Sequence, residues 1–140
     1  MKKTTIIIIT LVIALVFSAC GSVTDFQCSA VVKINNSHDS SYQISLYDID
    51  TYKKLFKSNT TITKIANNLD FEISNNELSR SIALQEINYT DTIEITVSYK
   101  DENQAKQILN TLLKQYPLIL KEYSSNLNFI VVSKSTDDSE

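Results

Sequence analysis

The chain has 140 residues, 43% of them hydrophobic, and a formal net charge of −3. This length is enough for one domain with one core, and an acidic balance argues against nucleic acid as a partner. A single glycine and a single proline exclude glycine-rich phosphate loops and collagen-like segments.

The N-terminal residues 1–19 are typical of an export signal. Two lysines precede an apolar run over 6–17, and small residues follow it. Ser18-Ala19-Cys20 resembles the end of a bacterial lipoprotein signal, although Phe17 stands where leucine is more common. The resemblance implies cleavage before Cys20 and a diacylglycerol on its sulfur. The mature chain would then sit on the extracytoplasmic face of the cell membrane, anchored by this lipid.

An uncleaved membrane anchor is the alternative interpretation of the same segment. A membrane span needs about 20 apolar residues, whereas the run over 6–17 is shorter and ends at Ser18. In both interpretations the lysines keep the N-terminus inside, so the rest of the chain lies outside the cytoplasmic membrane. Loss of the signal removes two lysines and leaves 11 basic against 16 acidic side chains, a net charge of −5.

Residues 20–25 are predicted to be a short linker, and a strand follows it. Apolar residues at every second position from Phe26 to Ile34 predict a strand with one buried face. Cys28 lies on that face and is interpreted as a small buried hydrophobe, with a reactive or intermolecular thiol as the alternative. An acylated Cys20 would leave it without a disulfide partner.

The next segments change from weak alternation to helical spacing. Residues 44–49 predict a short extended edge, after which Asp50 is expected to cap a helix. A second helix is expected to begin near Ser58. Ser74-Asn-Asn-Glu77 fits the capping-box pattern and predicts a short helical turn.

Two strands and the longest helix come next. Strands are expected over 82–88 and 93–99, joined by a turn at 89–91. Asp101 is expected to cap a helix whose apolar stripe continues to Tyr123. Because Pro117 lies inside this helix, we expect a kink or a break near residues 113–116.

A last strand at 129–132 completes the domain, which is expected to span 26–133, and residues 134–140 form an acidic tail. The order strand, helices, strand, strand, helix, strand is the β-α-β-β-α-β pattern of a ferredoxin-like, two-layer α+β domain. In that arrangement the first strand and the strand at 93–99 are central.

Four stretches of spaced apolar and capping residues carry a likeness to a known family: 50–58, 62–69, 78–82 with 91–97, and 99–110. These stretches resemble the extracytoplasmic N-terminal domain of the polysaccharide chain-length determinant (Wzz-type) family, and the likeness as a whole covers roughly residues 26–133. Members of this family usually carry two membrane spans. Here a lipoprotein-like signal replaces the first span, and no apolar run follows Val132, so we expect a lipoprotein form without the second span.

The resemblance implies a non-catalytic interaction or regulatory module in cell-surface polysaccharide assembly. The implied partners are the membrane, through the lipid on Cys20, and either a second copy or a membrane-spanning chain-length determinant. Two surfaces are candidates for such contacts: the tyrosine and leucine beside Pro117, with Leu118 off the main stripe, and the outer strand at 82–88. Ordinary surface apolar residues are the alternative interpretation of both.

The sequence predicts no enzyme, cofactor or metal site. His38 is the only histidine and is interpreted as an exposed loop residue, so a catalytic triad or a zinc site cannot be assembled. Asp48 and Asp50 could bind a cation, but helix capping explains Asp50 more simply. A glycan- or solute-binding lipoprotein is the alternative function, for which the chain offers seven tyrosines and no tryptophan.

Overall fold

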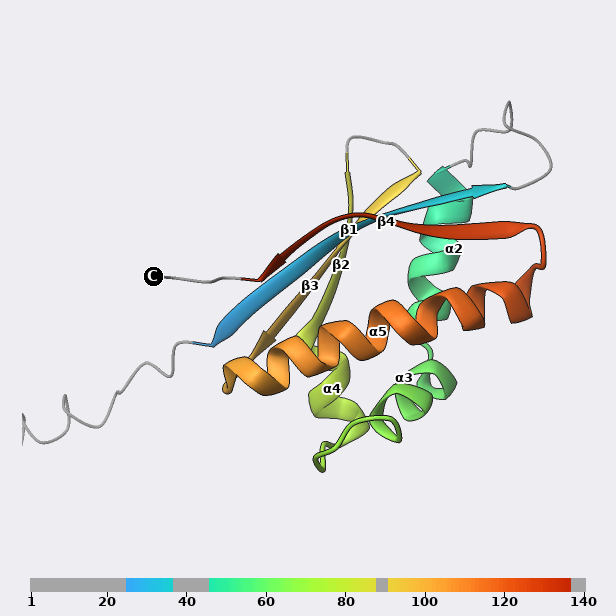
Figure 1. Ribbon diagram of the computed structural model, residues 1–140. Coiled ribbons are helices and arrows are strands. Elements are labelled where there is room, and N and C mark those ends of the chain that lie inside the picture. Colours follow the sequence, from blue (N-terminus) through green and yellow to red (C-terminus); the bar gives the residue numbers. More distant parts are fainter. Residues whose placement is uncertain (1–24, 37–45, 88–90, 137–140) are drawn as a thin grey trace, which may run out of the picture.

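The computed structural model describes residues 25–36, 46–87 and 91–136 (Figure 1). Within these ranges the protein has a four-stranded antiparallel sheet and four helices, which confirms the predicted α+β class. The elements in chain order are β1 (Phe26–Asn36), α2 (Leu46–Phe56), α3 (Asn59–Ala66), α4 (Asn75–Ser81), β2 (Ile82–Glu86), β3 (Thr92–Tyr99), α5 (Glu102–Tyr123) and β4 (Leu127–Thr136).

The strands follow the order β2-β3-β1-β4, and every neighbouring pair is antiparallel. The two strands with the clearest alternation in the sequence, β1 and β3, occupy the centre, and β2 and β4 are the outer strands. The pairing of β1 with β4 shifts between Val31 and Val32. Their partners are Ser133 and Val131, so the intervening Val132 is an extra residue that forms a β-bulge in β4.

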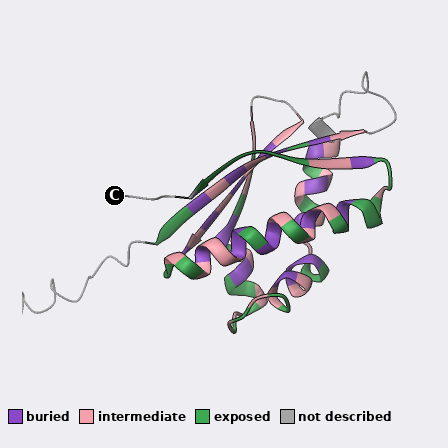
Figure 2. Ribbon diagram, viewed as in Figure 1, coloured by how far each residue is buried: buried purple, intermediate pink, exposed green. Residues whose placement is uncertain are grey.

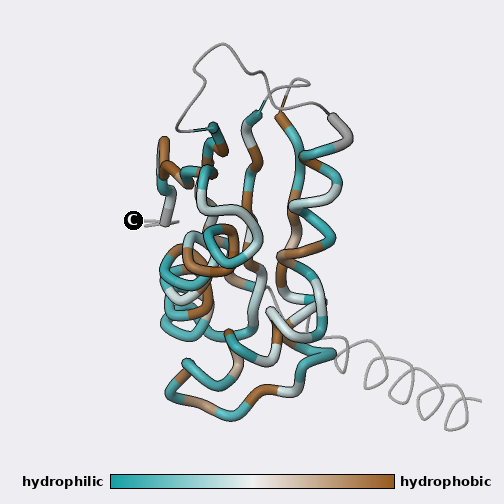
Figure 3. Tube along the Cα trace, turned by 90° about the vertical axis from the view of Figure 1, so that its right-hand side faces the viewer, coloured by the Kyte–Doolittle hydropathy of each residue, from teal (hydrophilic) through white to brown (hydrophobic). Residues whose placement is uncertain are grey.

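One face of the sheet packs against the helices. Along β1 the side chains at alternate positions from Cys28 to Ile34 are buried, and those between them are not. β3 repeats this pattern from Ile93 to Tyr99. Figure 2 shows the alternating burial along the strands, and Figure 3 shows hydrophobic and hydrophilic residues following one another along the same trace. We call the face formed by the positions that are not buried the open face.

The helices supply the other half of the core. α5 packs against β1, β3 and β4, and Phe56 of α2 stacks on Tyr116 of α5 with ring centroids 4.0 Å apart. Each large apolar side chain contributes about 1.5–3 kcal/mol when it is fully buried. The buried residues of α5 are Ala105, Ile108, Leu109, Thr111, Leu112, Tyr116, Ile119 and Leu120.

α2 corrects the prediction made for its segment. Leu46 begins a helix rather than lying in an extended edge, and Asp50 lies inside that helix instead of at its cap. The Asp50 carboxylate pairs with Lys54 Nζ at 2.7 Å, one helical turn further on. The helix forms because its buried side chains recur every three or four residues, at Ile49, Tyr52 and Phe56.

Three helix starts agree with the sequence prediction. Ser58, Ser74 and Asp101 are the N-caps of α3, α4 and α5. Their side-chain oxygens accept the backbone N–H three residues further on, at 3.3, 3.2 and 2.9 Å. Each cap of this kind contributes about 1 kcal/mol to helix stability.

The C-terminal half differs from the prediction in two places. α5 continues through Pro117 to Tyr123, so the helix is not broken there. The proline removes one backbone hydrogen bond, but buried residues on both sides of it keep the helix on the core. β4 extends to Thr136 instead of ending at Val132, because backbone pairing with β1 needs no apolar side chain. Residues 134–136, predicted to be tail, therefore pair with β1.

Candidate interaction surfaces

The residues predicted to attach the chain to the membrane are Cys20 and the apolar run over 6–17, and they lie outside the described ranges. His38, interpreted as an exposed loop residue, also lies outside them. No helix in the described ranges combines the length and apolarity that a bilayer crossing requires. Across residues 25–36, 46–87 and 91–136, no group of three or more histidine, cysteine or acidic side chains is arranged to hold a metal ion.

The thiol of Cys28 is part of the core. Its side chain is 4% exposed and lies on the helix-facing side of β1. Burial raises the pKa of the Cys28 thiol, against the smaller opposing effect of the nearby Lys134 and Lys106 ammonium groups. A buried thiol with a raised pKa is a poor nucleophile, which agrees with its interpretation as a small hydrophobe.

A polar cluster joins α4 to the end of β3. The Tyr99 hydroxyl donates to Glu77 Oε1 at 2.8 Å, and Lys100 Nζ lies 3.7 Å from the same oxygen and 5.4 Å from the Tyr99 ring centroid. Burial, followed by the hydrogen bond and charge of Glu77, raises the pKa of Tyr99 to about 12. The Glu77 side chain is therefore directed at Tyr99, and the cluster fastens the helix to the sheet.

Lys57 has a structural role that the sequence did not reveal. Its ammonium group donates to the backbone carbonyls of Ser79 and Ile82, the latter at 2.7 Å. Burial lowers the pKa of Lys57. These contacts hold the C-terminal end of α4 against the connection from α2 to α3, and carbonyls at a helix C-terminus favour a cation. Nothing in the local sequence marks this lysine, because its acceptors lie more than 20 residues away.

The open face of the sheet is mostly polar. Its cavity of about 220 Å³ is lined chiefly by Gln27, Ser29, Glu94, Thr96 and Ser135. The positions of β1, β2, β3 and β4 that point to this face carry no aromatic residue in the described ranges. Amides and hydroxyls can both donate and accept hydrogen bonds, so this face could bind a polyhydroxyl ligand without stacking on it.

A larger depression lies at the loop between α3 and α4. It encloses about 720 Å³ beside residues 66–75 and Glu77. Phe71 is its aromatic residue, and the Phe71 ring packs 5.9 Å from that of Tyr99. The described lining of this depression therefore offers a single aromatic ring, which already contacts Tyr99.

Exposed apolar side chains gather on β4. Ile130, Val131 and Val132 are 45%, 45% and 60% exposed. Of the surface residues predicted beside the proline, Leu118 is 56% exposed, as expected, but Tyr116 is fully buried. The prediction of an outer strand beginning at Ile82 agrees with the position of β2 in the sheet. The sequence prediction did not include β4 as a candidate contact surface. The consecutive apolar residues Ile130, Val131 and Val132, which do not alternate with polar ones, could have indicated it.

The chain matches no protein-family model, and no curated protein matches it at a significant level of similarity.

Proposed function

We propose that this chain is a lipid-anchored, non-catalytic interaction module on the extracytoplasmic face of a bacterial cell membrane, acting in cell-surface polysaccharide assembly. The observation that carries the proposal is the sequence Ser18-Ala19-Cys20 directly after an apolar run and a cationic start. Only residues 21–25 would separate the lipidated cysteine from β1, a reach of about 17 Å at most. The domain would therefore lie close to the lipid surface.

The arrangement of the chain ends supports attachment near the membrane. Cys28, near the start of β1, pairs with Thr136 at the end of β4. Both ends of the described domain therefore lie at the same end of the sheet, as Figure 1 shows. A Wzz-type domain with two membrane spans needs the same arrangement, because both of its ends must return to the membrane.

We further propose that the domain has the ferredoxin-like topology and is related in fold to the Wzz-type domain. The strand order β2-β3-β1-β4 with antiparallel neighbours supports this topology. So do the helices, which lie between β1 and β2 and between β3 and β4. The likeness concerns the fold, so the polysaccharide role rests on the sequence stretches that resemble the family.

A non-catalytic role fits the way the reactive side chains are used. Asp101 caps a helix, Asp50 pairs with Lys54, and Glu77 binds the Tyr99 hydroxyl. These three carboxylates are thus engaged in local structure, and Cys28 is buried. General acid–base catalysis needs a positioned acid or base in a cleft, whereas these side chains cap a helix, pair with a lysine or bind a tyrosine hydroxyl.

A glycan- or solute-binding lipoprotein is the second candidate, favoured by the polar cavity on the open face. Glu94 lies among Gln27, Ser29, Thr96 and Ser135 in that cavity, where its carboxylate could accept hydrogen bonds from sugar hydroxyls. Isothermal titration with the purified surface polysaccharide separates the two functions. Binding that Glu94→Gln weakens by tenfold or more would favour this candidate over the interaction module.

Cell fractionation tests the attachment, with Cys20→Ala as the variant and Cys28→Ala as the matched cysteine control. The wild type and Cys28→Ala should be found in the membrane fraction and be released by detergent. Cys20→Ala should keep its leader and fail to be processed. Recovery of the wild type in the cytosol would overturn the proposal. For the polysaccharide role, deletion of the gene should change the chain-length distribution, and Cys20→Ala should not restore it.

A further inference from the structure

The two outer strands of the sheet present unpaired backbone groups at opposite edges. In the part of the chain that the structure describes, no strand lies beyond β2 or β4. Outer strands of this kind are templates for pairing with another chain. The β4 edge also exposes Ile130, Val131 and Val132, so pairing there would remove apolar surface from water.

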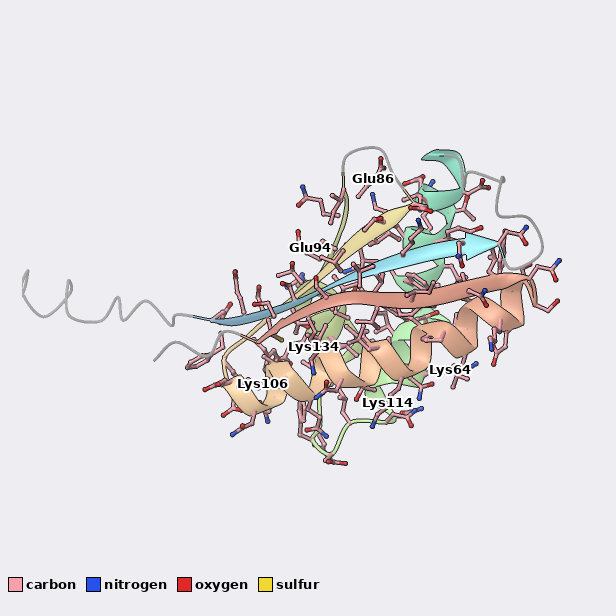
Figure 4. All side chains as sticks on the ribbon, turned by 45° about the horizontal axis from the view of Figure 1, so that its top comes forward. Lys64, Glu86, Glu94, Lys106, Lys114 and Lys134 are labelled. Carbon is pink, nitrogen blue, oxygen red and sulfur yellow. The ribbon has the colours of Figure 1, made fainter. Side chains whose placement is uncertain are left out.

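The two edges carry opposite charges. Lys134 on β4 donates a hydrogen bond to the neutral Asn110 side chain at 2.6 Å. Lys134 has no ion pair among the described residues, and the same holds for Glu86 on β2. In Figure 4 Lys134 lies on β4, whereas Glu86 lies on β2. This distribution favours a contact between unlike edges.

We propose that β4 of one copy pairs with β2 of a second copy of this chain, so that the sheet continues head to tail. This partner rests on the proposed function as an interaction module. β2 and β4 run in opposite directions, because three antiparallel pairings separate them. A second copy in the same orientation therefore offers its β2 antiparallel to β4, with its helices on the same face of the joint sheet.

The register of the strands brings the opposite charges within reach. Lys134 pairs with Ala30, Ala30 pairs with Ile95, and Ile95 pairs with Leu84. Lys134 and Leu84 therefore lie at the same height along the sheet. When the two copies stand level, Lys134 is one diagonal step from Glu86 of the second copy. Diagonal neighbours are about 7–8 Å apart, a distance that long side chains span, and both residues belong to the helix-facing side of the sheet.

The anchor selects this arrangement over pairing of β4 with β4. Antiparallel pairing of two β4 strands about a two-fold axis near Val131 would turn one copy upside down relative to the other. Val131 pairs with Val32 of β1. The start of β1 lies six residues before Val32, which is about 20 Å along the strand. The β1 starts of the two copies would then be about 40 Å apart, at opposite ends of the joint sheet. If the strands stand perpendicular to the membrane, residues 21–25 reach only about 17 Å, so both copies could not be anchored in the same membrane.

Mixed disulfide cross-linking of the full chain in native membranes tests the proposal. Ser133 pairs with Val31, Val31 pairs with Glu94, and Glu94 pairs with Gln85. Ser133 and Gln85 therefore lie at the same height along the sheet and on its open face. Both residues are exposed. Ser133→Cys and Gln85→Cys, carried on differently tagged copies in one cell, should form a mixed dimer on mild oxidation. Each variant expressed alone should not form it.

A third cysteine variant controls for chance collision. Gln27→Cys is exposed on the same face but lies on the inner strand β1, so its mixture with Ser133→Cys should cross-link at least tenfold less. Dimers from Ser133→Cys alone would instead show β4–β4 pairing and overturn the proposal. Absence of cross-links in every mixture would also overturn it, and would mean that Lys134 and the bulge protect the edge from pairing.

Charge reversal adds a readout that collision cannot mimic. Lys134→Glu in the copy that carries Ser133→Cys should lower the mixed product at least fivefold, and Glu86→Lys in its partner should restore it. Lys114→Glu changes the net charge equally and should leave the yield unchanged. Lipid attachment is measured separately by membrane recovery. A membrane-bound chain without mixed cross-links refutes the pairing alone, whereas a cytosolic chain refutes the proposed function.

Discussion

The hydroxyl of Tyr116 gives the sharpest stability prediction for this core. Tyr116 is fully buried in the middle of α5, with its ring stacked on Phe56 at 4.0 Å and 10° between the planes. Its hydroxyl has no hydrogen-bond partner among the described residues. Burial raises the pKa of Tyr116 far above its ordinary value, so the group stays neutral. Tyr116→Phe removes the oxygen and leaves the stacked ring in place.

The expected effect of Tyr116→Phe follows from the free-energy cost of burying the hydroxyl oxygen without a hydrogen bond. A buried hydroxyl without a hydrogen bond costs about 1–3 kcal/mol in proteins. Loss of the oxygen leaves a small gap that returns part of this gain, so we expect Tyr116→Phe to raise the free energy of unfolding by about 1 kcal/mol. For a domain of this size that corresponds to an increase in Tm of roughly 4 °C.

Thermal unfolding of the purified chain in detergent, followed by circular dichroism, measures this change. Tyr123→Phe is the matched control, because Tyr123 is 56% exposed, and its Tm should change by less than about 1 °C. Tyr116→Leu removes the ring stacking and should lower the Tm. If Tyr116→Phe lowered the stability by about 1 kcal/mol or more, the hydroxyl would have a partner and the reasoning would fail.

Three further predictions concern alkaline pH, a buried ammonium group and the proline. Because the pKa of Tyr99 is raised to about 12, the folded state keeps a proton that the unfolded chain loses near pH 10, so stability falls between pH 10 and about 12. Tyr99→Phe should flatten that decline in urea unfolding, and an unchanged slope would contradict it. Lys57→Met should lower the free energy of unfolding by about 1–2 kcal/mol through loss of the bonds to Ser79 and Ile82; a loss under about 0.5 kcal/mol would mean that those bonds contribute little. Pro117→Ala restores a backbone donor inside α5 and should raise stability by about 1 kcal/mol, and a lower Tm would show that the proline shape is needed.

The central elements of the fold could be predicted because their patterns are strong and long. β1 and β3 alternate over many residues with one face buried, and α5 keeps one apolar stripe for its whole length. The helix starts at Ser58, Ser74 and Asp101 could also be predicted from the sequence, because an N-cap needs only hydrogen bonds to residues a few positions away. These features depend on neighbours in sequence.

The missed features depend on contacts that are distant in sequence. The sequence predicts an extended edge at Leu46 to Ile49 because four residues are too few to show a helical period. The end of β4 was missed because Ser133 to Thr136 is held by backbone pairing with β1. Lys57 and Tyr99 find their partners only after folding. The charged edges likewise become visible only once the strand order is known.

The intact mass of the chain extracted from membranes tests the central claim most directly. The account predicts a chain that begins at Cys20 and is heavier than its amino-acid sequence by a diacylglycerol, with the added mass on the N-terminal peptide. A chain that retains residues 1–19 and carries no added mass would contradict it.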